Sequence, residues 1–289
     1  GIPFPEEYGG GGGDILSYAL AVEELARIDS SVAITMAAHI SLGTTPIYNW
    51  GSDEQKEEWM PVLTSAKKLA AFGLTEPEAG SDAGNTKTRA VLDGDEWVIN
   101  GAKQFITNSG TDISGCVSIT AVTGEDERGR AEISNFIVPN GTPGYTVEKP
   151  YRKMGWNASD THPLSFDDVR LPESAMLGPR GHGFKQFLQI LDGGRIGVAA
   201  MAVGVAQGAL DESIKYAKER QAFGKSISKF QSIQAKIADI SSQLEAARLL
   251  TYKAAIMKDR GENFTLTAAQ AKLITGRLAV RATEEAVQI

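Results

Sequence analysis

The sequence has 289 residues, of which 42% are hydrophobic and 22% charged, and its formal net charge is −7. These values are typical of a globular chain with one to three domains, and the scattered lysines and arginines argue against a nucleic-acid-binding face. Cys116 is the one cysteine and the three histidines are dispersed, so we expect neither a disulfide framework nor a metal site. Because no run of about 18 uncharged apolar residues occurs, we expect no membrane span.

Residues 1–67 are predicted to form a helical domain. Asp14 is suited to cap a helix whose apolar residues recur at helical spacing as far as Ile28. Ser52 and Gln55 form a capping-box pattern at the start of a second helix. The five glycines at 9–13 predict a loop, which does not fit a phosphate-binding loop because no strand precedes it and no Lys-Ser/Thr follows. The chain starts at Gly1 without the features of a signal peptide, as if entered from an earlier segment.

Residues 68–175 are predicted to form a β-domain. Short β-rich runs occupy residues 69–74, 86–92, 97–99, 104–107, 117–122, 133–138, 145–147 and 164–169. Asp93-Gly94 and Asn100-Gly101 suit tight turns between neighbouring strands, and the polar residues 124–130 predict a solvated hairpin loop. Regularly spaced strands without intervening helices predict an antiparallel barrel or sandwich.

Residues 176–289 are predicted to form a helical bundle. Spacings of three and four predict a packed seam through Phe230, Ile233, Ile237, Ile240, Leu244 and Ala247. Thr265 begins a further helix, whose apolar residues include Leu266, Ala269, Leu273 and Leu278. This helix still runs at Ile289, so we expect further chain or other subunits to cover it.

Four segments carry signals that secondary structure alone does not require. Residues 72–82 run from a predicted strand into a loop whose N–H groups and short hydroxyls suit a planar heterocycle or a phosphate, although an ordinary loop explains them too. Residues 103–108 are a strand with a polar end, or a plain sheet edge. Gly193 and Gly194 interrupt a helical pattern at a cost of about 1 kcal/mol each, which indicates a close approach or a kink. Basic residues before Gly224 fit a helix C-terminal cap.

Together these segments match one family in order and spacing. The chain contains Leu74-Thr75-Glu76-Pro77-x-x-Gly80-Ser81-Asp82, then Asn100-Gly101-x-Lys103-x-Phe105-Ile106-Thr107-Asn108, then Gly194-Arg195, then Arg220-x-x-Phe223-Gly224-Lys225 with Phe230-Gln231. This series resembles the acyl-CoA dehydrogenase family over essentially the whole chain, including Ile2-Pro3-x-Pro5-Glu6-x-Tyr8-Gly9-Gly10 at the start. The motifs are specific for the superfamily, and the third looks most like the short-chain, butyryl-CoA type.

The resemblance implies an N-terminal helical domain, a central antiparallel β-barrel or sandwich and a C-terminal four-helix bundle, truncated at both ends. It implies FAD, held between the β-domain and the bundle, with Thr75 hydrogen-bonded to the flavin ring. Arg220, Gln221, Ala222 and Gln231 would reach the FAD of a neighbouring subunit, which implies a homotetramer. Many relatives carry tryptophan where Phe105 stands. The implied FAD contacts are Phe72, Leu74, Thr75, Gly80, Ser81, Phe105, Ile106, Thr107, Arg220, Gln221, Ala222, Phe223, Gln231 and Gln288.

The implied reaction is the α,β-dehydrogenation of a short-chain or short branched-chain acyl-CoA to the trans-2-enoyl-CoA, a step of fatty acid β-oxidation in lipid metabolism. Flavin N5 takes the β hydride, a base takes the α proton, and hydrogen bonds polarise the thioester carbonyl. Electrons would pass to an electron-transfer flavoprotein. The resemblance assigns the acyl-CoA cavity to Ser81, Asp192, Gly193, Gly194 and Arg195.

The catalytic base of the family is a glutamate that usually lies beyond the position of Ile289. A minority of members place it before the arginine of the third motif, where this chain has Gly194. We therefore expect the base to follow Ile289. Glu284 and Glu285 lie near this end of the chain, but their positions on the helix give no other reason to choose them.

Two other functions share this scaffold. One is an oxygen-using relative, either an acyl-CoA oxidase or a flavin monooxygenase, and the other is a non-enzymatic protein that has kept the fold and lost the chemistry. For the dehydrogenase we expect the cytoplasm of a bacterium, or the mitochondrial matrix in a eukaryote.

Overall fold

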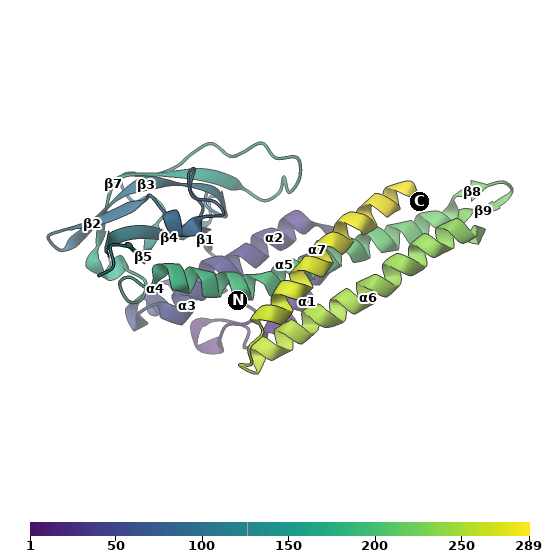
Figure 1. Cartoon of the computed structure of the whole chain (residues 1–289), viewed down its shortest axis with the longest axis horizontal. Helices are drawn as coiled ribbons and strands as arrows, with labels where there is room; N and C mark the ends of the chain where they lie inside the picture. Colours follow the sequence, from purple (N-terminus) through teal and green to yellow (C-terminus); the bar gives the residue numbers. More distant parts are fainter. Residues whose placement is uncertain (126) are drawn as a thin grey trace. The chain divides into compact units, whose positions relative to one another are not determined.

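The computed structural model describes every residue except Asp126. The chain divides into two compact units, and Figure 1 labels the α-helices and most of the strands. Unit 1 comprises Gly1–Gly12 and Ala38–Leu191, and unit 2 comprises Gly13–Ala37 and Asp192–Ile289. The domain limits that the sequence predicts, after residues 67 and 175, follow the change of hydrophobic period and stay a prediction.

Unit 1 opens with short helices around the first strand. Their bounds are η1 Glu6–Tyr8, the π-helical η2 Ala38–Thr44, α3 Thr45–Trp50 and α4 Asp53–Thr64. The predicted capping box is confirmed, because Ser52 and Gln55 exchange side-chain and backbone hydrogen bonds at the start of α4. The glycine run forms a loop, as predicted.

His39 ties the end of α4 to the first strand of the sheet. Its Nε2 lies 2.9 Å from the carbonyl oxygen of Leu63, and its Nδ1 accepts the N–H of Ala70 at 3.0 Å. Since Nδ1 accepts, the neutral ring carries its proton on Nε2. Burial lowers the pKa of His39 from 6.5 to about 4, although the Leu63 carbonyl opposes this shift.

Unit 1 is therefore expected to lose stability as the pH falls from about 6.5 to about 4. The pKa of His39 is lower in the folded protein than in the unfolded chain, so the unfolded chain binds the proton first as the pH falls. The stability that neutral His39 contributes is therefore complete only above the pKa of the unfolded chain. The shift corresponds to at most about 3 kcal/mol. Urea unfolding followed by tryptophan fluorescence measures it, since all four tryptophans lie in unit 1. His39→Gln, which keeps one donor and one acceptor, should flatten the pH slope; an unchanged slope would contradict the assignment.

Seven strands of unit 1 form one mixed sheet in the order β1-β4-β2-β3-β7-β6, with β5 beside β4. Their bounds are β1 Leu69–Gly73, β2 Arg89–Asp93, β3 Glu96–Thr107, β4 Ser114–Glu125, β5 Ala131–Pro139, β6 Tyr145–Val147 and β7 Thr161–Pro172. Short helices η3 Ala83–Asn85 and η4 Glu173–Ala175 lie in the connections. The predicted β-domain is confirmed, with one difference: β1 and β2 pair with β4 in parallel. The long connection from β1 to β4 makes this possible.

The two predicted glycine turns have different outcomes. Gly94, with φ +68°, lies in the two-residue turn that joins β2 to β3, as predicted. Asn100-Gly101 was predicted as a turn, and this was wrong, because β3 runs through it with a register shift at Gly101. Gly101 has φ +153°, and an added Cβ would lie 2.4 Å from Oγ1 of Thr88. A bulge and a close approach thus explain the glycine. The predicted hairpin loop at 124–130 joins β4 to β5, with Gly124 in β4 and Asp126 outside the described residues.

Unit 2 is built from long helices. Their bounds are α1 Ile15–Ile28, α2 Ser30–Ala37, the part of α5 Gly183–Glu219 that follows Leu191, α6 Gln231–Asp259 and α7 Thr265–Gln288. A small hairpin, β8 Gln221–Ala222 and β9 Lys225–Ser226, and the turn η5 Ile227–Lys229 join α5 to α6. Asp14 caps α1 by accepting the N–H of Ser17, as predicted. By length and hydropathy α5 could cross a membrane, but 56% of its most apolar stretch is buried, as in a core helix, so this is weak evidence for a span.

The helices of unit 2 pack through small side chains. The predicted seam of α6 is confirmed at Ile240, Leu244 and Ala247, which are all buried. In α7 the buried residues are Ala268, Ala271, Thr275, Leu278 and Ala282. Leu266 and Leu273, two of the apolar residues that the sequence places on this helix, have exposed fractions of 69% and 53%. The alanine stripe packs instead, since small side chains allow a closer approach between helices.

A buried polar cluster links α1 to α6. Arg248 Nε donates to Glu23 Oε1 at 2.8 Å, and Tyr252 Oη donates to Glu23 Oε2 at 2.8 Å. Glu23 is only 4% exposed. Burial, and then the hydrogen bond to Glu23, raise the pKa of Tyr252.

Candidate functional site

Two strands of unit 1 bring the first two predicted flavin segments together. β1 ends at Gly73, and the chain continues through Leu74 to Thr75, whose carbonyl oxygen accepts the N–H of Gln104 at 2.8 Å. This bond places Thr75 beside β3, which carries Phe105, Ile106 and Thr107. The structure therefore joins residues 72–75 to residues 105–107, which lie about thirty positions apart in the sequence.

Two hydroxyl groups at this junction are free to bind a ligand. Thr75 and Thr107 are both half-buried. Within the described part of the chain, neither hydroxyl forms a hydrogen bond to another residue. A buried or half-buried hydroxyl normally finds a partner, so an unused pair on adjoining segments is suited to a polar ligand.

Phe105 is held in a strained conformation at the same place. Its φ is +61°, and it lies where β3 bulges between Lys103 and Ile106. Holding an aromatic residue in the left-handed backbone region lowers stability by about 1–3 kcal/mol, and residues strained in this way cluster at ligand-binding sites. The ring is 61% exposed and packs against Tyr151 at a centroid distance of 5.0 Å. Ile106 differs, because its side chain is buried in the core and only its backbone remains for a ligand.

The loop after β1 presents the remaining predicted residues of unit 1. Phe72 stacks on Phe187 of α5 at a centroid distance of 4.0 Å. Gly80 and Ser81 are exposed, and a Cβ added at Gly80 would meet nothing within 4 Å. No protein contact thus requires glycine at position 80, which is consistent with the close approach of a ligand.

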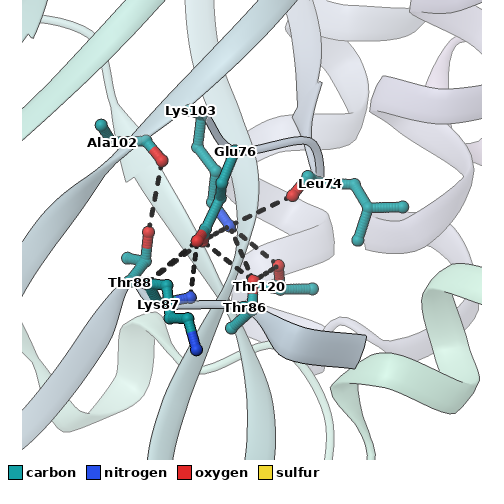
Figure 2. Close-up of polar contacts among 8 residues, drawn as sticks. All are labelled: Leu74, Glu76, Thr86, Lys87, Thr88, Ala102, Lys103 and Thr120. Carbon is teal, nitrogen blue, oxygen red and sulfur yellow. Dashed lines mark hydrogen bonds and ion pairs between the residues drawn. The ribbon is translucent and has the colours of Figure 1, made fainter. Parts of the chain in front are cut away.

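Beneath this loop lies an ion pair that the sequence analysis missed. Lys103 Nζ lies 2.7 Å from Glu76 Oε1, and the side chains are 0% and 2% exposed (Figure 2). Burial lowers the pKa of Lys103 to about 8, although Glu76 opposes the shift. Burial acts to raise the pKa of Glu76, but the Lys103 ammonium and its hydrogen bonds outweigh it, so that this pKa lies below its usual value. Both groups are therefore charged at neutral pH.

Asp160 is a second residue that the sequence analysis missed. Its two carboxylate oxygens accept the N–H of Asn108 at 3.0 Å and the N–H of Gly110 at 2.8 Å. Asn108 has φ +66° and directly follows Thr107. Asp160 thus fixes the sharp turn that ends the second predicted flavin segment. No local signal marks it, because its partners lie about fifty positions earlier.

Replacing Asp160 with alanine is expected to lower the free energy of unfolding by about 2 kcal/mol, because the N–H of the buried Asn108 and the N–H of the exposed Gly110 both lose their acceptor. Asp160→Asn keeps one acceptor oxygen and should recover roughly half of the loss. Urea unfolding followed by tryptophan fluorescence checks both variants. Equal stability of the alanine variant and the wild type would show that the turn does not depend on this carboxylate.

The predicted substrate residues lie on α5 in unit 2. Asp192 forms an ion pair with Arg195 one turn later and accepts the hydroxyl of Thr265 at 3.2 Å. A Cβ added at Gly193 would lie 2.7 Å from Nζ of Lys258, whose pKa is lowered by burial. Because α5 is continuous here, the glycine at 193 reflects a close approach and not a break in the helix.

The predicted intersubunit contacts also lie in unit 2. Arg220, Gln221 and Ala222 lead into the hairpin, and Gln231 begins α6. Phe223 and Gly224, with φ +50° and +75°, form the two-residue turn between β8 and β9. Interpreting Gly224 as a helix cap was therefore wrong, since α5 ends earlier, at Glu219. Phe223 is 94% exposed at the tip.

The end of α7 holds the last predicted residues. Gln288 is its final residue, and Glu285 forms an ion pair with Lys236 of α6. A paired carboxylate has a structural role, so the structure gives no support to Glu285 as the base. The expectation that the base follows Ile289 stays a prediction. Among residues 1–125 and 127–289, no cluster of three or more histidine, cysteine or acidic side chains could hold a metal ion.

Comparison with known proteins identifies the family. Residues 1–67 match the model for the acyl-CoA dehydrogenase N-terminal domain, residues 71–169 the middle domain and residues 181–289 the C-terminal domain. The chain belongs to the acyl-CoA dehydrogenase family of oxidoreductases.

Individual relatives align along the whole chain. The probable acyl-CoA dehydrogenase YngJ of Bacillus subtilis is 52% identical over all of this chain and 76% of its own length. Butyryl-CoA dehydrogenase from Megasphaera elsdenii superposes with a TM-score of 0.96 at 49% identity, covering all of this chain and 76% of that one. A chain in a structure of the electron transferring flavoprotein of Acidaminococcus fermentans gives 0.95 at 46% identity, covering all of this chain and 75% of that one.

Proposed function

We propose that this protein catalyses the FAD-dependent α,β-dehydrogenation of a short-chain or short branched-chain acyl-CoA and passes the electrons to an electron-transfer flavoprotein. The observation that carries the proposal is the junction of residues 72–75 with residues 105–107 in an acyl-CoA dehydrogenase fold. The butyryl-CoA dehydrogenase likeness supports the short chain length, and the likeness to a chain in the flavoprotein structure supports the electron acceptor.

The residues of the junction fit a flavin. The hydroxyls of Thr75 and Thr107 would hydrogen-bond its polar ring edge, and Phe105 would pack against its apolar part. The exposed backbone around Gly80 and Ser81 would hold the diphosphate. The bound flavin supplies a hydride acceptor, which no side chain can provide.

The substrate would lie against α5 of unit 2. Gly193 and Gly194 add no side chain to this part of the helix, and Asp192 and Arg195 provide polar groups on either side of them in the sequence.

We further propose a homotetramer in a bacterial cytoplasm. The exposed tip at Phe223 and its neighbours Arg220 and Gln221 would reach the FAD of a second copy, with Gln231 and Gln288 nearby in that contact. The exposed α7 residues Leu266, Leu273, Val280 and Val287 recur every seven positions and would be covered in such an assembly. The bacterial relatives at 52% and 49% identity support the compartment.

Anaerobic titration of the flavin-containing protein with acyl-CoA thioesters tests the function. Butyryl-CoA should bleach the visible flavin absorption at lower concentration than octanoyl-CoA does. No bleaching by any acyl-CoA would contradict the proposal. Peroxide formation at the rate of substrate oxidation in air would instead identify an oxygen-using relative.

A further inference from the structure

Lys103 is completely enclosed, although it carries a charge. Its Nζ donates to Glu76 Oε1 at 2.7 Å, to Thr120 Oγ1 at 2.9 Å and to the Leu74 carbonyl oxygen at 3.4 Å. Thr86 Oγ1 lies 3.5 Å away. Figure 2 shows the lysine and the glutamate pointing toward one another between the strands. The lysine of β3 is thus bonded directly to the segment that carries Thr75.

Glu76 accepts further hydrogen bonds on the other side of the ion pair. Its carboxylate accepts the N–H of Lys87 at 2.5 Å, the N–H of Thr88 at 3.2 Å and the hydroxyl of Thr86 at 2.9 Å. These groups close the loop between β1 and β2, which includes Gly80 and Ser81. One side chain therefore holds both ends of the loop that presents the predicted flavin contacts.

The pair acts on two neighbouring segments at once. Thr75 immediately precedes Glu76, and Gln104, whose N–H bonds Thr75, immediately follows Lys103. Any change in the distance between Glu76 and Lys103 would therefore change the spacing of Thr75 and Phe105. No other ion pair found among the described residues connects these two segments.

Stability alone is a poor explanation for this pair. Taking two charges out of water is costly, and apolar residues of similar volume often stabilise a protein as well or better. The depressed pKa of Lys103 shows that desolvation dominates despite the neighbouring carboxylate. A buried pair can, however, specify one geometry, because each charge must meet its partners at fixed distances.

We propose that Glu76 and Lys103 are positioning residues for the flavin site, fixing the spacing of Thr75 and Phe105 through a buried ion pair that does not itself touch the ligand. This inference rests on the proposed function. It assigns the pair a role in flavin affinity and spectrum beyond its part in folding.

The double variant Glu76→Gln/Lys103→Met tests the role, because it removes both charges and keeps both volumes. The thermal midpoint of the flavin-free protein should fall by roughly 5–10 °C, because no charge is left unpaired but the amide accepts fewer of the hydrogen bonds that Lys87 and Thr88 donate. Flavin affinity should fall about tenfold or more, and the visible absorption bands of the bound flavin should shift, because misplaced contacts weaken binding. Glu76→Gln alone, which removes the carboxylate that favours the charged form of Lys103, should lower both stability and affinity.

Glu23→Gln is the matched control. It changes a buried, ion-paired glutamate in unit 2, and none of its partners is a predicted flavin contact. It should lower stability while flavin affinity and spectrum stay within about twofold of the wild type. If the double variant, or Glu76→Gln in case the double variant does not fold, binds flavin with unchanged affinity and spectrum, the pair is only structural and the inference fails. A wild-type protein that takes up no flavin would overturn the proposed function as well.

Discussion

Replacing Gly204 with alanine is expected to lower the free energy of unfolding by about 3 kcal/mol, because α1 and α5 leave no room for a methyl group. An added Cβ would lie 2.2 Å from the carbonyl oxygen of Glu23 and 2.8 Å from Cβ of Ala26. The first atom belongs to the backbone of α1, so it cannot rotate away. Gly208, one turn later, would place a Cβ 2.3 Å from the carbonyl oxygen of Arg27. The two helices must therefore separate, which also disturbs the Glu23 cluster.

Chemical unfolding followed by far-UV circular dichroism measures this loss. Lys215→Ala provides a control on the same helix, since its side chain is 63% exposed and its one ion pair, to Glu212, is long at 3.7 Å. That variant should change stability by less than about 0.5 kcal/mol. If the Gly204→Ala variant is as stable as the wild type, α1 and α5 do not approach each other this closely.

Replacing both Thr75 and Thr107 with valine is expected to weaken flavin binding about a hundredfold, or about tenfold for each lost hydroxyl. Valine keeps the shape of threonine and its preference for strands, so the fold should remain. The removed hydroxyls bond no described protein group, so their loss leaves no unpaired protein partner. A ligand atom that they contacted would, in contrast, lose its partner.

Flavin affinity is measured by reconstituting the flavin-free variants and following the absorption of the bound fraction. Thr146→Val is the control, because Thr146 is an exposed threonine on β6 away from the junction. Affinity should not change in this variant. Unchanged affinity in the double threonine variant would mean that the flavin does not contact residues 75 and 107.

The sequence predicted those features that depend on short-range chemistry. Asp14 and Ser52 begin helices where capping rules place them, and Gly94 turns a hairpin because it must adopt positive φ. The motif containing Thr75 and the motif containing Thr107 were also predicted to belong to one site, and the structure brings these two segments together. Order and spacing within one family sufficed for this, because each motif is a contiguous segment.

Other features depend on contacts that no local pattern encodes. Glu76 and Lys103 lie 27 positions apart, and they meet only because β1, β4, β2 and β3 assemble in that order. Asn100-Gly101 has turn chemistry, but a bulge against Thr88 uses the same glycine. For α7 the hydrophobic period does not show which face of the helix packs against the other helices. The face with small residues is buried, and Leu266 and Leu273 are exposed.

The central claim is that this chain provides the flavin and acyl-CoA framework of a dehydrogenase that delivers electrons to a second flavoprotein. The most direct measurement is anaerobic turnover of the flavin-containing protein with butyryl-CoA and oxidised electron-transfer flavoprotein. We expect one trans-2-enoyl-CoA to form for each pair of electrons taken up by the acceptor. Enoyl-CoA formation that requires oxygen, or no enoyl-CoA with flavin fully bound, would contradict the account.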